Sequence, residues 1–266
     1  MSSLVVFADV GDVVTVTRAE RLSLSVTGPY ATALGPGDDN LILKALRALG
    51  QAAGIGDPPV AVTLDKRLPI AAGLGGGSSD AGTALKLASR ALGLGLDDAR
   101  LEEVSRVVGA DGPMCLRART AWAEGIGDRL TDETRLPPLY GLLVNPGVPS
   151  PTGAVYRAYD AGGPSNADRP SPPPDWSPDA FAAWLGQQRN DLEAPAIALA
   201  PAIGQTLDAV RALDGVRLAR MSGSGATVFA LFDTAQAAIL AAQAIAQAHP
   251  SWWLQATTFG QAYGHA

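Results

Sequence analysis

The sequence predicts an α+β protein with two lobes, and three observations support that prediction. Short β-branched or alternating runs in the first thirty residues indicate that the chain opens with a sheet. A strand, a glycine-rich loop and an amphipathic helix then follow one another between residues 60 and 92. Near Leu136-Pro137-Pro138 the composition changes and a new apolar strand begins. We therefore place one lobe over residues 1–137 and the other over residues 138–266.

Composition limits the kinds of partner that the chain can have. A net charge of -6 without any dense Lys/Arg run argues against nucleic acid or an anionic membrane as the main partner. The single cysteine, Cys115, excludes an internal disulfide framework, and His249 and His265 are too few for a His-rich metal site. The segment Met1 to Asp12 has no basic region and no long apolar stretch, so it predicts neither a signal peptide nor a membrane anchor. We expect a cytoplasmic protein without a structural metal.

The first lobe is expected to combine short strands with two principal helices. Its strands are β-branched or alternating runs at residues 4–8, 13–17, 22–26 and 60–64. After a turn cluster at Gly35–Asp39, Asn40 can cap a helix that Gly54 and Gly56 end. Its apolar face includes Leu41, Ala45, Ala48 and Leu49. A further helix follows the glycine loop, because apolar residues recur there at spacings of four, three and four, at Ala81, Leu85, Ala88 and Leu92.

Later segments complete the predicted α+β pattern. Residues 101–108 indicate a short helix, which Ala110-Asp111-Gly112-Pro113 breaks, so Asp111 is expected at a junction. The Pro- and Gly-rich segment from Asp160 to Pro178 predicts an exposed loop within the second lobe. Around it we expect strands near 140–144, 216–219, 227–232 and 252–257, helices near 179–187, 191–199 and 202–213, a loop at 222–225 and an Ala-rich helix before the last strand.

The most informative stretch runs from Pro69 to Asp80 and contains four glycines within five positions, Gly73 to Gly77. Glycines let the backbone approach a ligand closely, and the helix that follows supplies a positive dipole end, so the combination suits phosphate. A Walker A loop would need Lys before Ser/Thr, whereas Ser78-Ser79 follow the last glycine directly. A dinucleotide fingerprint would need glycine where Ser78 stands.

The residues around this loop leave several roles open. The hydroxyls of Ser78 and Ser79 can bind phosphate oxygens or a magnesium ion, and either residue can instead serve as the helix N-cap. Asp80 can complement the helix dipole in the first turn. A flexible turn without a ligand is the simplest alternative.

The pattern Pro-x-x-x-Gly-Leu-Gly-Gly-Gly-Ser-Ser-Asp resembles the ATP-binding motif of the GHMP kinases. The triple glycine is similar to that of one branch, the 4-diphosphocytidyl-2-C-methyl-D-erythritol kinases, whereas mevalonate and homoserine kinases more usually carry a shorter glycine run. The resemblance implies an N-terminal nucleotide-binding lobe and a C-terminal ferredoxin-like lobe, with the active site in the cleft between them. It also implies ATP and Mg²⁺ as cofactors.

Two further motifs stand in the order that the family has. Gly109-Ala110-Asp111-Gly112-Pro113 resembles its Gly-Ala-Asp-x-Pro segment, in which the Asp is the catalytic carboxylate, although Asp-Gly alone is an ordinary turn signal. Arg220 to Phe229 resembles the third motif, a glycine turn from the second lobe that packs beside the phosphate loop, although a hairpin alone would also explain it. Smaller similarities begin at Asp39, Gly125 and Asn190.

The resemblance then assigns roles to particular residues. ATP-binding positions are implied at Asn40, Pro69, Ala72, Gly73, Leu74, Gly75, Gly76, Gly77, Ser78, Ser79, Gly223, Ser224 and Gly225. Asp111 would orient the acceptor hydroxyl and take its proton. The segment around Thr152 and Tyr156 resembles the one that binds the substrate's cytosine, which makes Tyr156 a candidate stacking residue; a core aromatic on a helix is the alternative. Ser79 is the candidate magnesium ligand.

The implied activity is transfer of the ATP γ-phosphate to the 2-hydroxyl of 4-diphosphocytidyl-2-C-methyl-D-erythritol, a step of the non-mevalonate route to isoprenoid precursors. The substrate is therefore expected to be a small cytidine diphosphate-linked polyol, with no nucleic acid or membrane partner, and the chain a monomer or weak homodimer. The alternatives are another GHMP kinase of homoserine or mevalonate type, or a catalytically compromised nucleotide-binding protein.

One departure from the family indicates either that the start of the chain has been placed too late or that the last alternative holds. The family normally opens with a strand bearing Pro-x-Lys-x-Asn, whose Lys assists catalysis, and then an Asp-Gly-Tyr-His segment that contacts the cytidine. The segment starting at Met1-Ser2-Ser3-Leu4 resembles the residues just after that segment. We therefore expect the first strand of the N-terminal lobe to be missing. Because Lys44 and Lys66 lie in no matching motif, the role of that lysine is not carried over.

Overall fold

The computed structural model describes residues 2–34, 37, 39–163 and 169–260, and it divides the chain into two compact units. Unit 1 consists of Met1–Val5, Gly11–Ile70 and Gly75–Asp132, and unit 2 consists of Val6–Val10, Ala71–Leu74 and Glu133–Ala266. The glycine-rich segment is therefore shared between the units, which are described separately below. Parts of two predicted loops, residues 35–36, 38 and 164–168, lie outside the described residues, as does His265.

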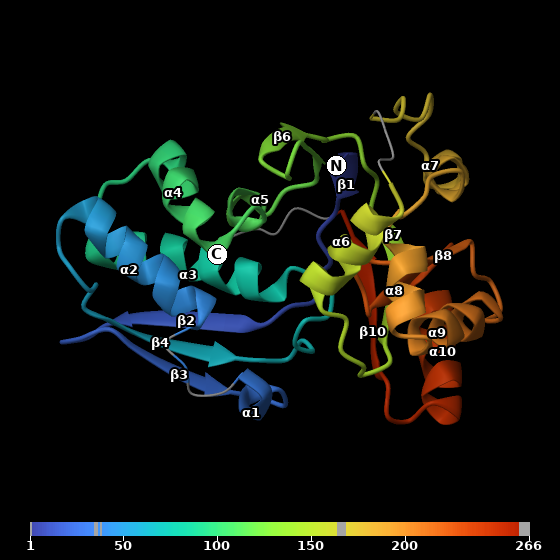
Figure 1. Cartoon of the computed structure of the whole chain (residues 1–266), viewed down its shortest axis with the longest axis horizontal. Coiled ribbons are helices and arrows are strands. Elements are labelled where there is room, and N and C mark those ends of the chain that lie inside the picture. Colours follow the sequence, from blue (N-terminus) through green and yellow to red (C-terminus); the bar gives the residue numbers. More distant parts are fainter. Residues whose placement is uncertain (1, 35–36, 38, 164–168, 261–266) are drawn as a thin grey trace. The chain divides into compact units, whose positions relative to one another are not determined.

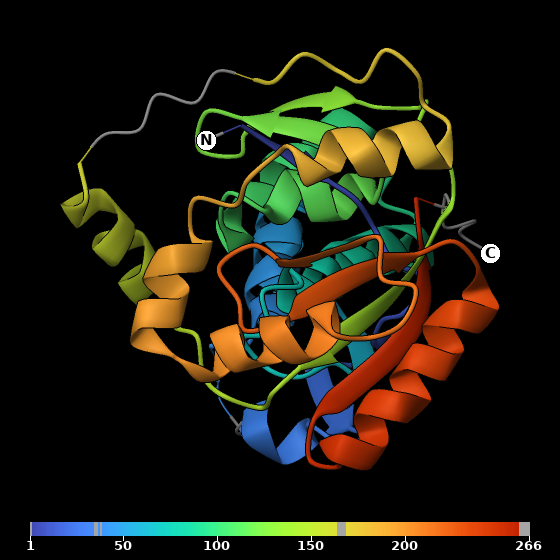
Figure 2. The ribbon, with the colours of Figure 1, turned by 90° about the vertical axis from the view of Figure 1, so that its right-hand side faces the viewer.

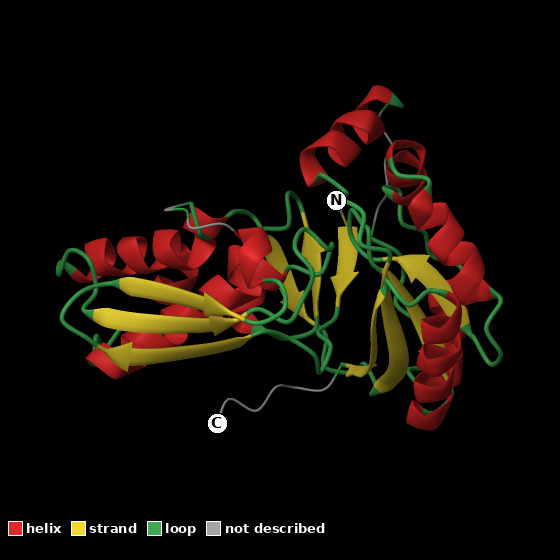
Figure 3. Ribbon diagram, turned by 90° about the horizontal axis from the view of Figure 1, so that it is seen from below, coloured by secondary structure: helices red, strands yellow, loops and turns green. Residues whose placement is uncertain are grey.

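Unit 1 contains the strand, loop and helix arrangement that the sequence predicts. Strands β2 (Val13–Arg18), β3 (Ser23–Thr27) and β4 (Val60–Asp65) form one sheet in the order β2-β4-β3. The central strand β4 pairs antiparallel with β2 and parallel with β3. Helices α2 (Leu41–Ala53) and α3 (Gly76–Leu92) cover one face of this sheet (Figure 1). In Figure 3, which is seen from below, the strands of this sheet lie in front of the helices.

Helix α2 begins and ends where the sequence predicts. The side chain of Asn40 accepts a 2.9 Å hydrogen bond from the backbone N–H of Ile42, which satisfies one of the free donors of the first turn. At the other end Gly54 takes a left-handed conformation with a φ of 70°. The core of unit 1 lies where α2 and α3 meet the sheet, and its fully buried members include Leu46, Leu49 and Leu85.

Helix α3 begins earlier than predicted. Its N-cap is Gly75, in a left-handed conformation and without a side-chain capping bond, so Gly76 and Gly77 are already helical. The alternative in which Ser78 or Ser79 serves as the N-cap is excluded, because both residues lie inside the first turn. The prediction that Asp80 complements the dipole in that turn is also wrong, since the first turn contains no acidic residue.

The rest of unit 1 is built from short elements. These are the helices α1 (Ala31–Leu34), α4 (Asp98–Ser105), the 3-10 turn η1 (Arg106–Val108) and α5 (Gly112–Arg117), and the strands β1 (Ser2–Val5), β5 (Ala121–Glu124) and β6 (Arg129–Asp132). The three strands form an antiparallel sheet in the order β1-β5-β6. Strands β5 and β6 were not predicted. The first strand ends at Val5, three residues earlier than predicted.

Unit 2 has the ferredoxin-like topology that the family resemblance implies. Strands β7 (Leu139–Asn145), β8 (Leu218–Met221), β9 (Val228–Phe232) and β10 (Trp253–Phe259) form an antiparallel sheet in the order β10-β7-β9-β8. Its helices are α6 (Thr152–Ala161), α7 (Pro178–Gly186), α8 (Glu193–Leu199), α9 (Ala202–Arg211) and α10 (Ala235–Ala248). The sequence β7, helices, β8, β9, α10, β10 is the βαββαβ pattern of that fold.

The core of unit 2 lies between this sheet and the helices beside it. Leu142 of β7 and Val228 of β9 are buried together with Ile203 of α9 and Ile245 of α10. Figure 2 shows α10 running alongside β10. At the edge of the sheet, Phe7 and Ala8 follow β10 through a bridge to Phe259 and a backbone bond to Gly260. Among the described residues no helix is both long and apolar enough to cross a bilayer.

Candidate functional site

The start of α3 in unit 1 presents unpaired backbone donors. Gly75 has a φ of 65°, and the N–H of Ser79 closes the first helical bond, 2.9 Å to the carbonyl of Gly75. The N–H groups of Gly76, Gly77 and Ser78 therefore have no acceptor within the helix. These amides and the positive end of the dipole of a 17-residue helix form an anion-binding geometry.

The start of α2 lies against this turn. A methyl group built on Gly77 would be 3.4 Å from Cδ1 of Leu41, which shows how closely the two helix starts approach. Asn40 is the residue that precedes Leu41 and caps this helix. Its side-chain oxygen is used in capping α2, which holds Leu41 in this place.

Helix α5 connects Asp111 to the same turn. The thiol of Cys115 donates a 3.8 Å hydrogen bond to the carbonyl of Gly75 and also contacts Ser79. A Cβ at Gly82 of α3 would lie 3.0 Å from the backbone of Leu116, so the two helices pack at close range. Burial raises the pKa of Cys115 to about 11, which keeps the thiol protonated as a donor.

Asp111 is the N-cap residue of α5, but its carboxylate makes no capping bond. The side chain reaches solvent, yet nearby protein atoms partly desolvate it and raise its pKa above the ordinary value. Its charge in turn helps to raise the pKa of Cys115, so the carboxylate lies close to the thiol that contacts Ser79. The junction that the sequence predicts at Asp111 is thus confirmed, and it lies beside the anion-binding turn.

A buried charge cluster that the sequence analysis missed lies at the base of this turn. The ammonium of Lys66, which is 3% exposed, donates 3.0 Å to the carboxylate of Asp80 and also bonds to Asp12. Burial raises the pKa of Asp80 to about 7, although Lys66 opposes the shift. No local sequence signal pairs these residues, because Asp12 lies 54 positions before Lys66.

The remaining glycine-loop residues, Ala71–Leu74, belong to unit 2 and pack on its third motif. The hydroxyl of Ser222 donates 2.9 Å to the carbonyl of Gly73, and the N–H of Thr227 donates 3.1 Å to the carbonyl of Ala72. At Gly73, with a φ of 72°, a Cβ would lie 2.5 Å from the carbonyl oxygen of Gly225. Only glycine fits there, and the predicted packing of the third motif beside the loop is therefore observed for these residues.

Side chains from two other parts of unit 2 hold the third motif. Asn190 donates bonds of 3.0 and 2.8 Å to the carbonyls of Met221 and Gly223. Ser150 donates 2.6 Å to the carbonyl of Ser224, whose hydroxyl lies 3.0 Å from that of Thr152. Ser224 is therefore joined to the start of α6. The sequence motifs include Asn190 and Ser222 without giving either side chain a role, and they do not include Ser150.

Tyr156 lies one turn after Thr152 on α6 and is 40% exposed. This exposure contradicts the alternative that Tyr156 is a core aromatic. Because residues four apart share a face of a helix, Thr152 and Tyr156 point to the same side of α6.

The predicted site residues thus fall into two sets. Asn40, Pro69, Gly75, Gly76, Gly77, Ser78, Ser79 and Asp111 belong to unit 1, and Ala72, Gly73, Leu74, Thr152, Tyr156, Gly223, Ser224 and Gly225 belong to unit 2. Contacts described above connect Gly75, Ser79 and Asp111 through Cys115 in unit 1, and Ala72, Gly73 and Gly225 with the third motif and Thr152 with Ser224 in unit 2.

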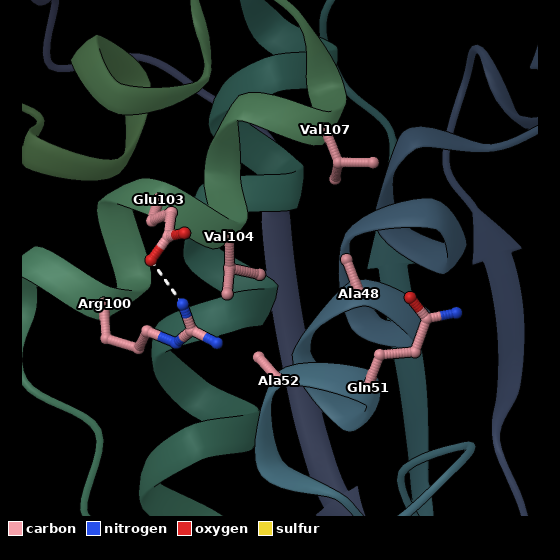
Figure 4. Close-up of a pocket in the computed structure, with 7 residues that line it drawn as sticks. All are labelled: Ala48, Gln51, Ala52, Arg100, Glu103, Val104 and Val107. Atoms are coloured by element: carbon pink, nitrogen blue, oxygen red, sulfur yellow. Dashed lines mark hydrogen bonds and ion pairs between the residues drawn. The ribbon is translucent and has the colours of Figure 1, made fainter.

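A hollow of about 370 Å³ elsewhere in unit 1 is separate from these residues. It lies between α2 and α4 and is lined by Ala48, Gln51, Ala52, Arg100, Glu103, Val104 and Val107 (Figure 4). Arg100 and Glu103, which both line the hollow, form an ion pair on α4. None of the predicted site residues lines the hollow.

Comparison with known proteins identifies the family. Residues 40–118 match the model of the GHMP kinases N-terminal domain, and residues 177–251 match that of the GHMP kinases C-terminal domain. A 4-diphosphocytidyl-2-C-methyl-D-erythritol kinase of Caulobacter vibrioides is 51% identical over 259 residues, which cover 96% of this chain and 89% of the relative. The chain belongs to the GHMP kinase family. The family that the sequence predicts is confirmed.

Other relatives within the GHMP kinase family agree. A 4-diphosphocytidyl-2-C-methyl-D-erythritol kinase of Hyphomonas neptunium is 50% identical, with 98% of this chain and 89% of the relative covered. A crystal structure of 4-(cytidine 5'-diphospho)-2C-methyl-D-erythritol kinase matches with a TM-score of 0.75 at 34% identity, covering 98% of this chain and 90% of that one. The homoserine kinase of Cytophaga hutchinsonii, at 18% identity and a TM-score of 0.69 over 98% and 90% of the two chains, shares the fold.

Proposed function

We propose that this chain is an ATP-dependent kinase that phosphorylates the 2-hydroxyl of 4-diphosphocytidyl-2-C-methyl-D-erythritol, in the non-mevalonate route to isoprenoid precursors. The observation that carries the proposal is the 51% identity, over 96% of the chain, to a kinase named for that substrate. The homoserine kinase is only 18% identical, which supports the cytidyl substrate over a homoserine-type alternative.

The first task of such a kinase is to hold the ATP phosphates. The N–H groups of Gly76, Gly77 and Ser78 would donate to phosphate oxygens, because they point out of the start of α3 without helical partners. They carry no full charge, so the dipole of α3 adds to their attraction for the anion. Since the backbone donors are fixed before ATP arrives, little reorganisation is required during transfer.

The second task is to activate the acceptor hydroxyl, and Asp111 is the candidate. A carboxylate can orient the hydroxyl toward the γ-phosphorus and accept its proton as the new P–O bond forms. Partial desolvation raises the pKa of Asp111, which makes it a better proton acceptor than an ordinary aspartate. The carboxylate is not used in capping α5, so it keeps its acceptor capacity for a substrate.

Magnesium would neutralise charge on the phosphates during transfer. The hydroxyl of Ser79 is a hard oxygen donor in the first turn of α3 and would be its protein ligand. Among the described residues there is no group of three or more His, Cys, Asp or Glu arranged for a metal. This agrees with a Mg²⁺ ion that is held mainly by phosphates and water, as Mg²⁺ usually is in ATP-dependent enzymes.

The cytidine part of the substrate would bind to unit 2. Tyr156 offers an exposed aromatic face for stacking on the cytosine, and Thr152 offers a hydroxyl on the same side of α6. The contact between Thr152 and Ser224 would link this region to the third motif. A cytoplasmic location and a monomeric or weakly dimeric state remain predictions from the sequence.

ADP release in the presence of ATP and magnesium tests the proposal. The acceptors are 4-diphosphocytidyl-2-C-methyl-D-erythritol, homoserine and mevalonate, and Asp111→Asn serves as the inactive control. We expect turnover with the cytidyl polyol alone and its loss in the control. Turnover with homoserine or mevalonate would place the chain in another branch. ATP binding without turnover on any acceptor would favour the nucleotide-binding alternative.

A further inference from the structure

We propose that Lys66 is a positioning residue for the phosphate-binding turn of α3. The inference rests on the proposed function, because it takes the amides of Gly76, Gly77 and Ser78 as the ATP-phosphate site. Lys66 does not itself touch phosphate in this account. Lys66 acts by holding the backbone of α3, whose amides bind the phosphates.

The cluster joins the segments on either side of the glycine loop. Lys66 follows β4 directly, and its ammonium donates 3.0 Å to Asp80, the fifth residue of α3. The same ammonium bonds to Asp12, which also accepts the backbone N–H groups of Arg67 at 2.6 Å and Leu68 at 2.8 Å. One lysine therefore fixes the entrance to the loop and the beginning of the helix that follows it.

The cluster also lies directly against the turn. A Cβ built on Gly76 would be 3.4 Å from Nζ of Lys66, 3.6 Å from Oδ2 of Asp12 and 3.2 Å from Cδ1 of Leu68. The ion cluster thus fills the space that a side chain at Gly76 would occupy. A change in the position of the ammonium would shift the first free amide of α3.

Electrostatics explains why a lysine is needed at this place. Asp12 and Asp80 place two acidic side chains beneath a turn that must attract an anion, and without a cation the negative charge that they carry would repel the phosphates of ATP. All three side chains are almost completely buried, with 4%, 0% and 7% of the side chain exposed for Lys66, Asp12 and Asp80. Water therefore screens this charge poorly. Lys66 offsets the carboxylates as well as orienting the turn.

A positioning role and a purely structural role of Lys66 predict different changes in the binding of adenosine, ADP and ATP. If Lys66 positions the phosphate-binding amides, its loss must weaken the binding of a ligand more when that ligand carries more phosphates. Binding of adenosine should change little, binding of ADP should weaken, and binding of ATP should weaken most. Simple loss of folded protein would lower the binding of all three ligands by the same factor.

The test compares full-length variants at a temperature where each is folded by circular dichroism. The double variant Lys66→Met/Asp80→Asn removes the lysine without leaving an Asp80 charge uncompensated. The single variant Lys66→Met is measured beside it for comparison. Arg135→Met is the matched control, because it breaks an ion pair of 2.7 Å to the buried carboxylate of Glu133 in unit 2. Dissociation constants are measured by calorimetry for ATP and ADP and by ligand-observed NMR for adenosine.

We expect the dissociation constant of the double variant for ATP to be at least tenfold above that of wild type. Its constant for adenosine should stay within twofold of the wild-type value, and the change for ADP should lie between these two. The control should bind all three within twofold. An unchanged ATP constant, or an equal change for adenosine and ATP, would overturn the role of Lys66. A wild-type chain that binds ATP no better than adenosine would instead overturn the proposed function, so the two failures are distinguishable.

Discussion

The hydroxyl of Ser222 donates a 2.9 Å hydrogen bond to the carbonyl of Gly73, a residue 149 positions earlier in the chain. A second bond, from the N–H of Thr227 to the carbonyl of Ala72, lies beside it. Two glycine motifs that are remote in sequence therefore form one structure within unit 2. The close approach of Gly73 to Gly225 makes that structure intolerant of side chains.

Replacing Gly73 by alanine should destabilise unit 2 by at least about 2 kcal/mol, because the new Cβ would lie 2.5 Å from a backbone oxygen and φ is positive. Gly147→Ala is the control, since it has a φ of 75° but no atom within 4 Å of the added Cβ, and should cost about 1 kcal/mol. Urea unfolding followed by tryptophan fluorescence measures both. Equal losses would show that the close contact is unimportant.

Folding stability should depend on pH through Asp80. Its folded pKa of about 7 lies above the ordinary value near 4, so the folded state holds a proton that the unfolded state loses in this range. The contribution of Asp80 to stability is therefore fully present below about pH 4 and is lost as pH rises toward 7, by on the order of 1 kcal/mol per pH unit. Asp80→Asn should flatten this slope in denaturation series at pH 5, 6 and 7. Identical slopes for the two proteins would exclude Asp80 as its source.

Catalysis should be lost at low pH because Asp111 must be ionised to accept a proton. Its folded pKa is raised by partial desolvation, so kcat/KM should rise with pH through a value above that of an ordinary aspartate. Measurement of kcat/KM over a pH series with saturating magnesium tests for this rise. If the rate stayed constant down to pH 4, Asp111 could not be the base with a raised pKa.

Tyr156→Leu should raise the KM for the cytidyl substrate by roughly 5- to 20-fold, since stacking on one base contributes about 1–2 kcal/mol. The KM for ATP should stay within twofold. Tyr140→Leu is the control, because Tyr140 is 37% exposed, close to the 40% of Tyr156, but lies on β7 instead of α6. Comparable effects of both substitutions on the cytidyl KM would indicate a general effect on unit 2.

Local signals predicted those elements that local interactions determine. Asn40 was recognised as a cap because an Asn side chain before an apolar periodic segment satisfies free N–H groups, and the structure has that bond. The start of α3 was placed too late, since glycines carry no side chain that marks where the helix begins. The strands β5 and β6 are only four residues long and gave no periodicity to detect.

Long-range contacts explain what sequence reasoning missed at the site. Lys66 meets Asp12 and Asp80 only because β4, the segment before β2, and α3 converge, and no spacing in one sequence encodes that meeting. Ser222 likewise gains its role from a partner in a distant motif. The motifs themselves were recognisable because their glycines and Asp111 stand at spacings that the GHMP kinase family shares.

The most direct test of the account follows the fate of the ATP γ-phosphate. The chain is mixed with γ-radiolabelled ATP, magnesium and 4-diphosphocytidyl-2-C-methyl-D-erythritol, and the radioactivity of the separated products is counted. The position of the new phosphate is assigned by phosphorus-31 NMR of the product of a parallel reaction with unlabelled ATP. The account predicts that the label appears on the 2-hydroxyl of the polyol at the same rate as ADP forms, and that Asp111→Asn slows transfer at least about 100-fold. Label released as inorganic phosphate, or an equal rate in Asp111→Asn, would contradict it.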